Sequence, residues 1–243
     1  MKSSSAARLV LGLALLALPA ATAPAGAADK VPVQVRAVTW QGKIMLDRKV
    51  RTGTTNVATS SKAGCLGGSP SDGSKRIPGA TALGALYDAA RSINSPKRLL
   101  LSDAFDFGLG VCGVGGAVAS GEQWWELTYN HKPSSLGGEG TTLRRNHTVL
   151  WYLSKSYNET SPDELFLKAP ERVRRNGSFR VRVLAYNDNG RARPVEGARL
   201  SLADSELTGV NGYTRLKVKK KTRIVARATG LIPSNRAVVR IRR

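Results

Sequence analysis

Few residues of this sequence have the neighbours that catalysis or metal binding requires. Neither His131 nor His147 has a cysteine or a carboxylate at a spacing typical of metal ligands or of a nucleophile and its base. The chain also lacks the HExxH, GxSxG and SxxK motifs of common hydrolases. We therefore predict that the protein is not an enzyme, that it has no catalytic residue, and that it binds no metal and no cofactor.

Two weaker patterns favour solvated loops. Asp103 and Asp106 precede a glycine-rich segment, but a calcium site needs more oxygen ligands than two carboxylates supply. Gly113, Gly115 and Gly116 lack the lysine and the following helix of a phosphate-binding loop. Neither pattern predicts a site.

The densest group of aromatic residues is the candidate binding surface. Trp124 and Trp125 are adjacent in a predicted strand, so their side chains point to opposite faces. One of them fills the core while the other is exposed or covered by a loop, and the alternation does not decide which. Packing within the sheet explains this group as well as ligand binding does. The candidate ligand-binding residues are Trp124, Trp125, Tyr129 and Trp151.

The charge of the chain is strongly positive and unevenly distributed. The 243 residues include 38 Lys and Arg against 17 Asp and Glu, a net charge of +21. Residues 28–165 carry 16 basic and 12 acidic side chains, whereas residues 166–243 carry 20 basic and 5 acidic. The basic residues at outward strand positions include Arg180, Arg182, Lys217, Lys219, Arg240 and Arg242.

Two interpretations of this basic surface remain open. It is either an ordinary solvated surface, or it makes a weak, salt-sensitive contact with acidic wall polymers or anionic lipid heads. Specific nucleic-acid binding is not expected, because few aromatic residues interrupt the basic segment and base stacking needs them.

The first 28 residues have the pattern of a secretory signal peptide. Lys2 and Arg8 form the basic start, residues 9–18 form an apolar run too short to span a bilayer, and residues 25–27 are typical of a cleavage site near Ala27. We expect a secreted, cell-surface or periplasmic protein.

Export makes the two cysteines informative. Cys65 and Cys112 are the only cysteines of the sequence, and exported proteins favour disulfides. Their spacing excludes a CxxC redox motif, and a zinc site needs more ligands. We predict a structural disulfide between them.

The sequence divides into two predicted domains. Residues 29–157 combine strand patterns with one clear helix, 81–92, which Thr81 caps, so we expect an α+β head domain with a small sheet and one main helix. Residues 158–170 are expected to be a linker, and residues 171–243 show only short strands with turn residues between them, which predicts an all-β sandwich. The expected strands are 31–39, 43–50, 97–104, 121–130, 148–153, 178–186, 195–202, 213–219, 223–228 and 238–242; residues 108–116 are expected to be irregular.

The predicted head resembles a known domain family. The motifs that carry the resemblance are the helix that begins at Thr81, the glycines of 108–116, WWELTYN at 124–130 and NHTVLWY at 146–152. In this order they are similar to the C-terminal β-domain of transcobalamin and intrinsic factor. Two positions depart from the family pattern: Asn130-His131 replaces a usual Asn-Gly turn, and Arg145-Asn146 stands where Gly-Asp is common. The resemblance implies an α+β fold and, from the vertebrate members, a corrinoid ligand.

The predicted sandwich is similar to the carboxypeptidase regulatory-like and bacterial immunoglobulin-like modules. The motifs are PVEGA at 194–198, TGVNGYT at 208–214 and ARATGLIP at 226–233. This resemblance implies a spacer or adhesive unit without catalytic residues.

The residues and both resemblances together favour an exported, non-enzymatic binding or surface protein. Its head would bind a small molecule or a surface protein on the aromatic residues, and its basic sandwich would act as a spacer or as a contact with the cell envelope. The alternative is a purely structural protein of the cell envelope or of a surface assembly, without a small-molecule ligand. The oligomeric state is left open.

Overall fold

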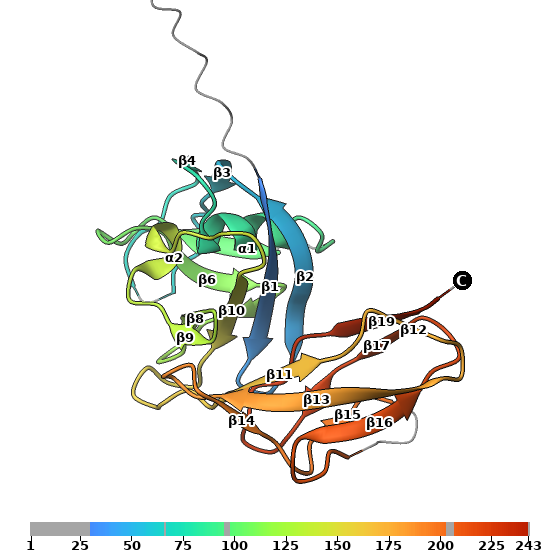
Figure 1. Cartoon of the computed structure of the whole chain (residues 1–243). Helices are drawn as coiled ribbons and strands as arrows, with labels where there is room; N and C mark the ends of the chain where they lie inside the picture. The colour runs from blue at the N-terminus through green and yellow to red at the C-terminus, as the bar shows by residue number, and fades with distance from the viewer. Residues whose placement is uncertain (1–29, 66, 95–97, 203–206, 243) are drawn as a thin grey trace, which may run out of the picture.

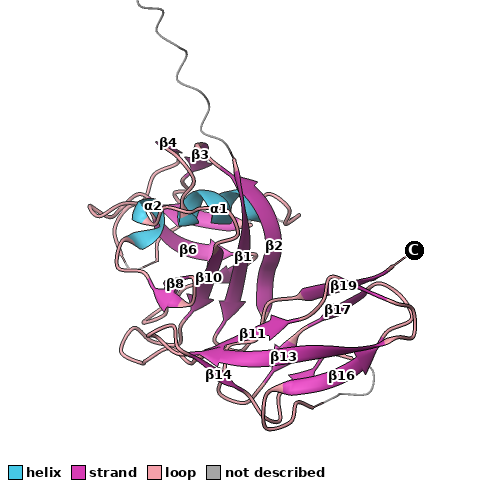
Figure 2. Cartoon of the chain, in the orientation of Figure 1, coloured by secondary structure: helices cyan, strands magenta, loops and turns pink. Residues whose placement is uncertain are grey.

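The computed structural model describes residues 30–65, 67–94, 98–202 and 207–242 (Figure 1). These residues form mostly β-strands in several sheets, with two short helices among them (Figure 2). Their buried apolar side chains form two large clusters, one before residue 154 and one after residue 164. We call residues 30–157 the N-terminal part and residues 158–242 the C-terminal part. The predicted signal peptide lies outside the described residues, within which no helix is long and apolar enough to cross a membrane.

A five-stranded sheet is the frame of the N-terminal part. Its strands are β1 (Val31–Thr39), β2 (Ile44–Thr52), β8 (Trp125–Tyr129), β9 (Lys132–Pro133) and β10 (Thr148–Leu153). The order is β2-β1-β10-β8-β9, in which β1 and β10 are parallel and the other pairs are antiparallel. Alternation along β1 directs Val33, Val35 and Ala37 into the N-terminal core. Arg36 and Val38 lie on the opposite face, toward the C-terminal part.

The helix α1 (Ala82–Ala90) lies where the sequence predicts one, and it packs on β1 and β2. The Thr81 hydroxyl accepts a hydrogen bond from the Gly84 backbone N–H at 3.1 Å, which satisfies one of the free donors of the first turn. Leu83 and Leu86 are fully buried in the N-terminal core. One face of the sheet is therefore closed by this helix (Figure 1).

Smaller elements complete the N-terminal part. They are the pair β3 (Thr55–Ala58) and β4 (Ser74–Ile77), the three-stranded sheet of β5 (Leu99–Ser102), β6 (Gly110–Val114) and β7 (Ala117–Val118), and the short helix α2 (Gly137–Gly140).

The expectation that residues 108–116 are irregular is wrong, because β6 lies within them. A Cβ atom on Gly110 would lie 2.2 Å from the ring of Phe105, so glycine lets the strand pass this ring without displacing it. Glycine serves close packing here rather than a turn.

Cys65 and Cys112 form the predicted disulfide, with Cα atoms 5.4 Å apart. The bridge ties the loop after β3 to β6. The two cysteines are 47 positions apart in the sequence. Closing a loop of this length restricts the unfolded chain, which stabilises the fold by about 4 kcal/mol in the chain-entropy description.

The C-terminal part contains only strands among its described residues. They are β11 (Glu164–Lys168), β12 (Arg172–Val173), β13 (Ser178–Tyr186), β14 (Ala192–Pro194), β15 (Arg199–Leu200), β16 (Tyr213–Lys217), β17 (Thr222–Ile224), β18 (Ala226–Arg227) and β19 (Ala237–Ile241). β13 pairs with β11, β14 and β16, while β12, β19 and β17 form a second sheet and β15 and β18 a third. Phe179, Val181 and Val183 alternate into the core between them, as the sequence predicts.

The range expected to be a linker, residues 158–170, holds a strand. β11 occupies residues 164–168 and pairs with β13 along its whole length. Leu165 and Leu167 are buried in the C-terminal core. Pro162 and Pro170 lie outside β11, so they do not interrupt its backbone hydrogen bonds.

A buried ion pair joins the two parts of the molecule. Arg36 on β1 is 3% exposed, and its guanidinium donates to the Glu164 carboxylate and to the carbonyl oxygens of Leu165 and Pro233. All three partners belong to the C-terminal part. A buried charge is tolerated only when it is paired and its remaining donors are satisfied, and here both conditions are met.

Other contacts extend the same interface. Asp47 accepts a hydrogen bond from the Arg236 backbone N–H, and Arg227 donates to the Gly42 carbonyl at 2.7 Å. Burial raises the pKa of Asp47, and the nearby Arg36 partly offsets that effect. Val38 and Ile232 also pack together in a small apolar cluster between the parts.

Replacing Arg36 with methionine tests this interface. The variant leaves the Glu164 carboxylate buried without its guanidinium, so we expect the free energy of unfolding in urea to fall by about 3–5 kcal/mol. Lys49→Met is the matched control, because it removes the same charge from an exposed pair with Glu171 across the same interface; we expect a loss of about 1 kcal/mol or less. Equal losses in the two variants would contradict the role of Arg36.

Candidate functional site

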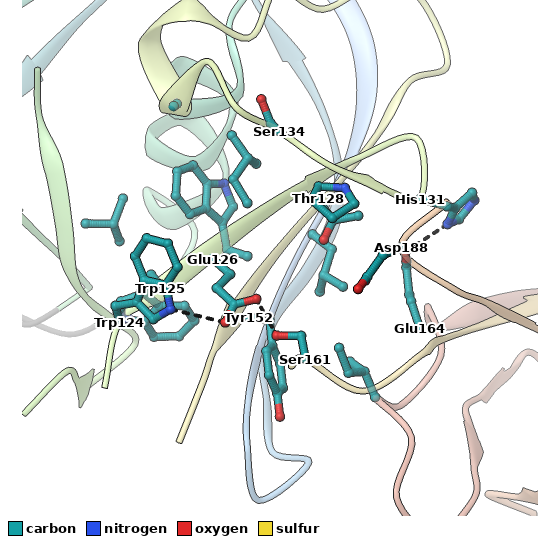
Figure 3. Close-up of a pocket in the computed structure, with 18 of the residues that line it drawn as sticks. Trp124, Trp125, Glu126, Thr128, His131, Ser134, Tyr152, Ser161, Glu164 and Asp188 are labelled. Carbon is teal, nitrogen blue, oxygen red and sulfur yellow. Dashed lines mark hydrogen bonds and ion pairs between the residues drawn. The ribbon is translucent and has the colours of Figure 1, made fainter. Parts of the chain in front are cut away.

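A cavity of about 250 Å³ lies where β8, the loop before β6 and the C-terminal part meet. The loop contributes Phe105 and Phe107, β8 contributes residues 125–128, and the C-terminal part contributes Glu164 and Asp188. Figure 3 shows Trp124 and Trp125 at one end of this cavity, His131, Glu164 and Asp188 at the other, and Glu126 between them. The cavity therefore has an aromatic end and a polar end.

The start of β8 decides which of the two adjacent tryptophans is exposed. Trp125 is the first residue of the strand and is 5% exposed in the N-terminal core, whereas Trp124 precedes the strand and is 41% exposed. Phe107 is 85% exposed and stacks on Phe105, with ring centroids 5.2 Å apart. Together with the buried Trp151, these rings form an aromatic wall that runs from the core to the surface.

Glu126 lies in the middle of the cavity and is held by neutral donors. Its carboxylate accepts a hydrogen bond from Trp124 Nε1 at 3.1 Å and another from the Ser161 hydroxyl. Neither partner carries a charge. Tyr152, which also lines the cavity, has a pKa raised to about 12 by burial and by the negative charge of Glu126. Its phenol is therefore neutral at physiological pH.

The polar end is built across the interface of the two parts. His131 Nδ1 lies 2.8 Å from Glu164 Oε2, and the imidazole stacks on Tyr186 with centroids 3.8 Å apart and planes 10° from parallel. Phe166 meets the same ring edge-on. Burial and the charge of Glu164 raise the pKa of the Tyr186 hydroxyl. His131 thus connects the β8–β9 turn to the carboxylate that also holds Arg36.

The backbone of this turn adopts an uncommon conformation. Asn130 and His131 have φ angles of 45° and 66°, the left-handed region that a two-residue hairpin turn requires. Glycine is favoured at the second position, and a residue with a Cβ atom costs roughly 1–2 kcal/mol there. The contacts of His131 with Glu164 and Tyr186 offset this cost. Strain of this kind marks positions where the side chain has a role.

The structure brings three of the four predicted ligand-binding residues together at the cavity. Trp124, Trp125 and Trp151 line it, but Tyr129 does not. The Tyr129 hydroxyl lies 2.9 Å from Nδ1 of His147, and the Arg144 backbone N–H donates to the same nitrogen at 2.9 Å. Tyr129 therefore belongs to a polar contact near the start of β10.

Several residues that line the cavity were not among the predicted ligand-binding residues. Phe105, Phe107 and Asp188 lie in loops, where no periodic pattern distinguishes them. Glu126 alternates with the aromatic residues of β8, and this alternation could have identified it. Glu164 fell in the range interpreted as a linker.

The histidines and Asp103 are engaged by neighbouring protein groups. His131 is enclosed by Glu164, Tyr186 and Phe166, and Nδ1 of His147 is occupied by two donors. Asp103 accepts two hydrogen bonds from Ser71, which lower the pKa of its carboxyl group. Within the described residues, no three His, Cys, Asp or Glu side chains are grouped to hold a metal ion.

The predicted basic surface is divided between two sheets. Arg180 lies opposite Arg215 in the pairing of β13 with β16. The centroid of the Tyr213 ring is 4.2 Å from the guanidinium carbon of Arg180 and 4.9 Å from that of Arg182. Lys217 lies opposite Ser178 in the same pair of strands. Arg240, by contrast, is on β19, and Arg242 follows that strand; Lys219 is an exposed residue after β16. Arg180, Arg182, Arg215 and Lys217 form no ion pair with a described residue.

No known protein family matches this chain, and no curated protein matches it either.

The pKa of His147 gives a testable pH dependence. Burial and the charge of Arg144 lower this pKa from its ordinary value of 6.5. The unfolded chain therefore binds a proton at His147 more readily than the folded chain does. The contribution of His147 to the unfolding free energy is present above pH 6.5, and it is lost as the pH falls through the lower pKa of the folded state. We expect the unfolding free energy in urea to fall between about pH 7.5 and about pH 5 by more in the natural protein than in His147→Asn, which keeps an acceptor near Nδ1. Parallel pH profiles would show that His147 does not contribute.

Proposed function

We propose that the protein is an exported, non-enzymatic binding protein that captures a small molecule in the cavity beside β8. The observation that carries this proposal is the aromatic wall: Phe107 and Trp124 leave large apolar rings exposed at the mouth of a cavity that polar groups close at its other end. Exposed apolar surface is costly unless it meets a partner. Cavities that combine aromatic walls with a few convergent polar groups are typical of ligand sites.

The fold is compatible with the family resemblance that the motifs suggest. We propose that the N-terminal part is an α+β head domain similar to the transcobalamin C-terminal domain, and that the C-terminal part is a β-sandwich. The β1–β2 hairpin before α1, and the β8–β9 hairpin and the central strand β10 after it, support the first assignment, although the β3–β4 pair and the β5–β6–β7 sheet are inserted in this order. The three sheets around one apolar core support the second.

The size of the cavity favours a ligand smaller than a corrinoid. Its volume of about 250 Å³ lies below the roughly 300–1,000 Å³ typical of sites for drug-sized ligands. A corrinoid would extend far beyond it. We therefore propose a ligand with one ring or a short apolar body, and a corrinoid remains a comparison compound.

Export supports an extracellular or periplasmic place of action. The signal-peptide pattern of residues 1–28 and the disulfide between Cys65 and Cys112 both fit an oxidising compartment. The alternative function, a purely structural role in the cell envelope or a surface assembly, predicts that the cavity takes no ligand.

A thermal-shift screen of the mature full-length chain separates these functions. The full chain is needed because the C-terminal part supplies Glu164, Tyr186 and Asp188 to the cavity. A ligand at 100 times its Kd should stabilise the protein by about 2.7 kcal/mol, which raises Tm measurably. The panel contains small aromatic and aliphatic metabolites and corrinoids.

Two tryptophan variants localise any ligand that the screen finds. Trp124→Ala should abolish most of the shift, whereas Trp40→Ala should preserve it, because Trp40 is equally exposed at 41% but lies outside this cavity. A shift that both variants retain would place binding elsewhere. No shift with any compound would favour the structural alternative.

We propose in addition that the basic face of β13 and β16 contacts acidic polymers of the envelope. The supporting observation is the register that places Arg180 opposite Arg215, with no acidic side chain paired to either among the described residues. Like charges that face each other destabilise a sheet. An anionic polymer would relieve this repulsion.

Retention on a polyphosphate column tests the basic face. We expect Arg180→Gln/Arg215→Gln to elute at clearly lower salt than the natural protein, since the attraction of this face is electrostatic. The control, Lys43→Gln/Lys62→Gln, removes two exposed charges from the N-terminal part and should elute later than the arginine variant. Equal shifts in both variants would indicate an unspecific effect of net charge.

A further inference from the structure

The charges around the cavity are opposite in sign to those of the protein as a whole. The chain has 38 Lys and Arg among 243 residues, yet none is among the described residues that line this cavity, whose acidic residues are Glu126, Glu164 and Asp188. Two other cavities in the described part of the chain contain basic residues, among them Arg199 and Arg227 in one and Lys49 and Arg236 in the other. Of these three cavities, the aromatic one alone has a described lining without Lys or Arg.

The three carboxylates differ in how their charge is compensated. Glu164 is already paired with Arg36 and His131. Glu126 has only the indole N–H of Trp124 and the hydroxyl of Ser161 as donors, and Asp188 is exposed at the turn after β13 without an ion pair among the described residues. The carboxylate in the middle of the cavity and the one at its edge remain available to a cation.

The aromatic wall favours a cation that carries an apolar body. The indole N–H of Trp124 donates to Glu126, so this carboxylate lies at the edge of a ring whose π face attracts cations. The exposed ring of Phe107 and the half-buried ring of Phe105, on which it stacks, offer apolar contact beside it. A bare metal ion would gain little from these rings and would find fewer oxygen ligands than divalent cations require.

We propose that the ligand of this cavity is an organic cation, an ammonium group attached to an aromatic or apolar body, with Glu126 as its counter-ion. This inference rests on the proposed function and names the chemical class that the cavity selects. The ammonium contacts Glu126 and the indole of Trp124, the apolar body lies along the phenylalanine wall, and Asp188 adds negative potential at the polar end. An anionic ligand of the same shape is excluded, because the negative charges of Glu126 and Asp188 repel it.

Three probes with the same ring and different charges test this class. We would measure by calorimetry the affinity of the mature full-length protein for 2-phenylethylammonium, 2-phenylethanol and 3-phenylpropionate. The expected order of affinity is cation, then neutral alcohol, then anion. The preference for the cation should decrease with added salt, since it is electrostatic.

Two glutamate variants assign the effect to one carboxylate. Glu126→Gln retains the shape and an acceptor but loses the charge, so it should weaken binding of the ammonium by about tenfold and leave the alcohol unchanged. Glu122→Gln is the matched control, because Glu122 also accepts a hydrogen bond from a serine, Ser156, but lies outside the cavity. It should bind all three probes as the natural protein does.

The outcomes separate this inference from the proposed function. If the three probes bind equally, or if Glu126→Gln binds the ammonium unchanged, the cavity is a binding site but does not select cations, and the inference is overturned. If none of the three binds, this ligand class is excluded. The metabolite screen with the Trp124 and Trp40 variants then decides separately whether the cavity binds anything.

Discussion

The ion pair between Arg36 and Glu164 is the constraint on which the arrangement of the two parts depends. Its two residues are 128 positions apart in the sequence, and both are almost fully buried. Removing two charges from water costs several kcal/mol for each, so the pair persists only because the remaining hydrogen-bonding groups are also satisfied. Two backbone carbonyls complete the guanidinium, and His131 completes the carboxylate. A displaced C-terminal part would leave one of these groups buried and unpaired.

The cavity is a consequence of this docking. Helix α1 closes one face of the five-stranded sheet, and the C-terminal part lies against the other. β9 pairs only with the last two residues of β8, so residues 125–127 of β8 have no strand beside them on that side. Residues of both faces meet around this edge: Trp125 and Leu127 from the helix side, Glu126 and Thr128 from the other. The site thus forms at the edge of the sheet, beside both the N-terminal core and the C-terminal part.

The sequence pattern predicted those elements that are determined by interactions between residues close together in the sequence. The alternation of β1 and the capped helix after Thr81 follow from periodicity and from one hydrogen bond, and both lie where the sequence places them. β6 could not be predicted, because its glycines meet other segments through tertiary packing: Gly110 meets the Phe105 ring, and Gly113 meets Leu100 and β7. The exposure of Trp124 depended on the exact first residue of β8, which alternation alone does not define.

The candidate site was predicted only on its N-terminal side, for a similar physical reason. Aromatic residues cluster in the sequence around residue 124 and are visible there, but their polar partners come from β11 and the turn after β13. Those partners are brought close by Arg36, which lies between the inward-facing Val35 and Ala37 of β1. A buried arginine in an amphipathic strand has no local signature.

The electrostatics of the whole molecule and of the cavity act over different distances. A net charge of +21 repels cations, but at physiological ionic strength this repulsion is screened beyond about 8 Å. Glu126 acts at contact distance inside a recess whose described lining contains no Lys or Arg. The effective dielectric constant is lower there, so the same charge interacts more strongly. A basic exterior and a cation-selective cavity are therefore compatible. In the two proposals, the basic exterior contacts acidic polymers, while the residues that line the cavity select the charge of its ligand.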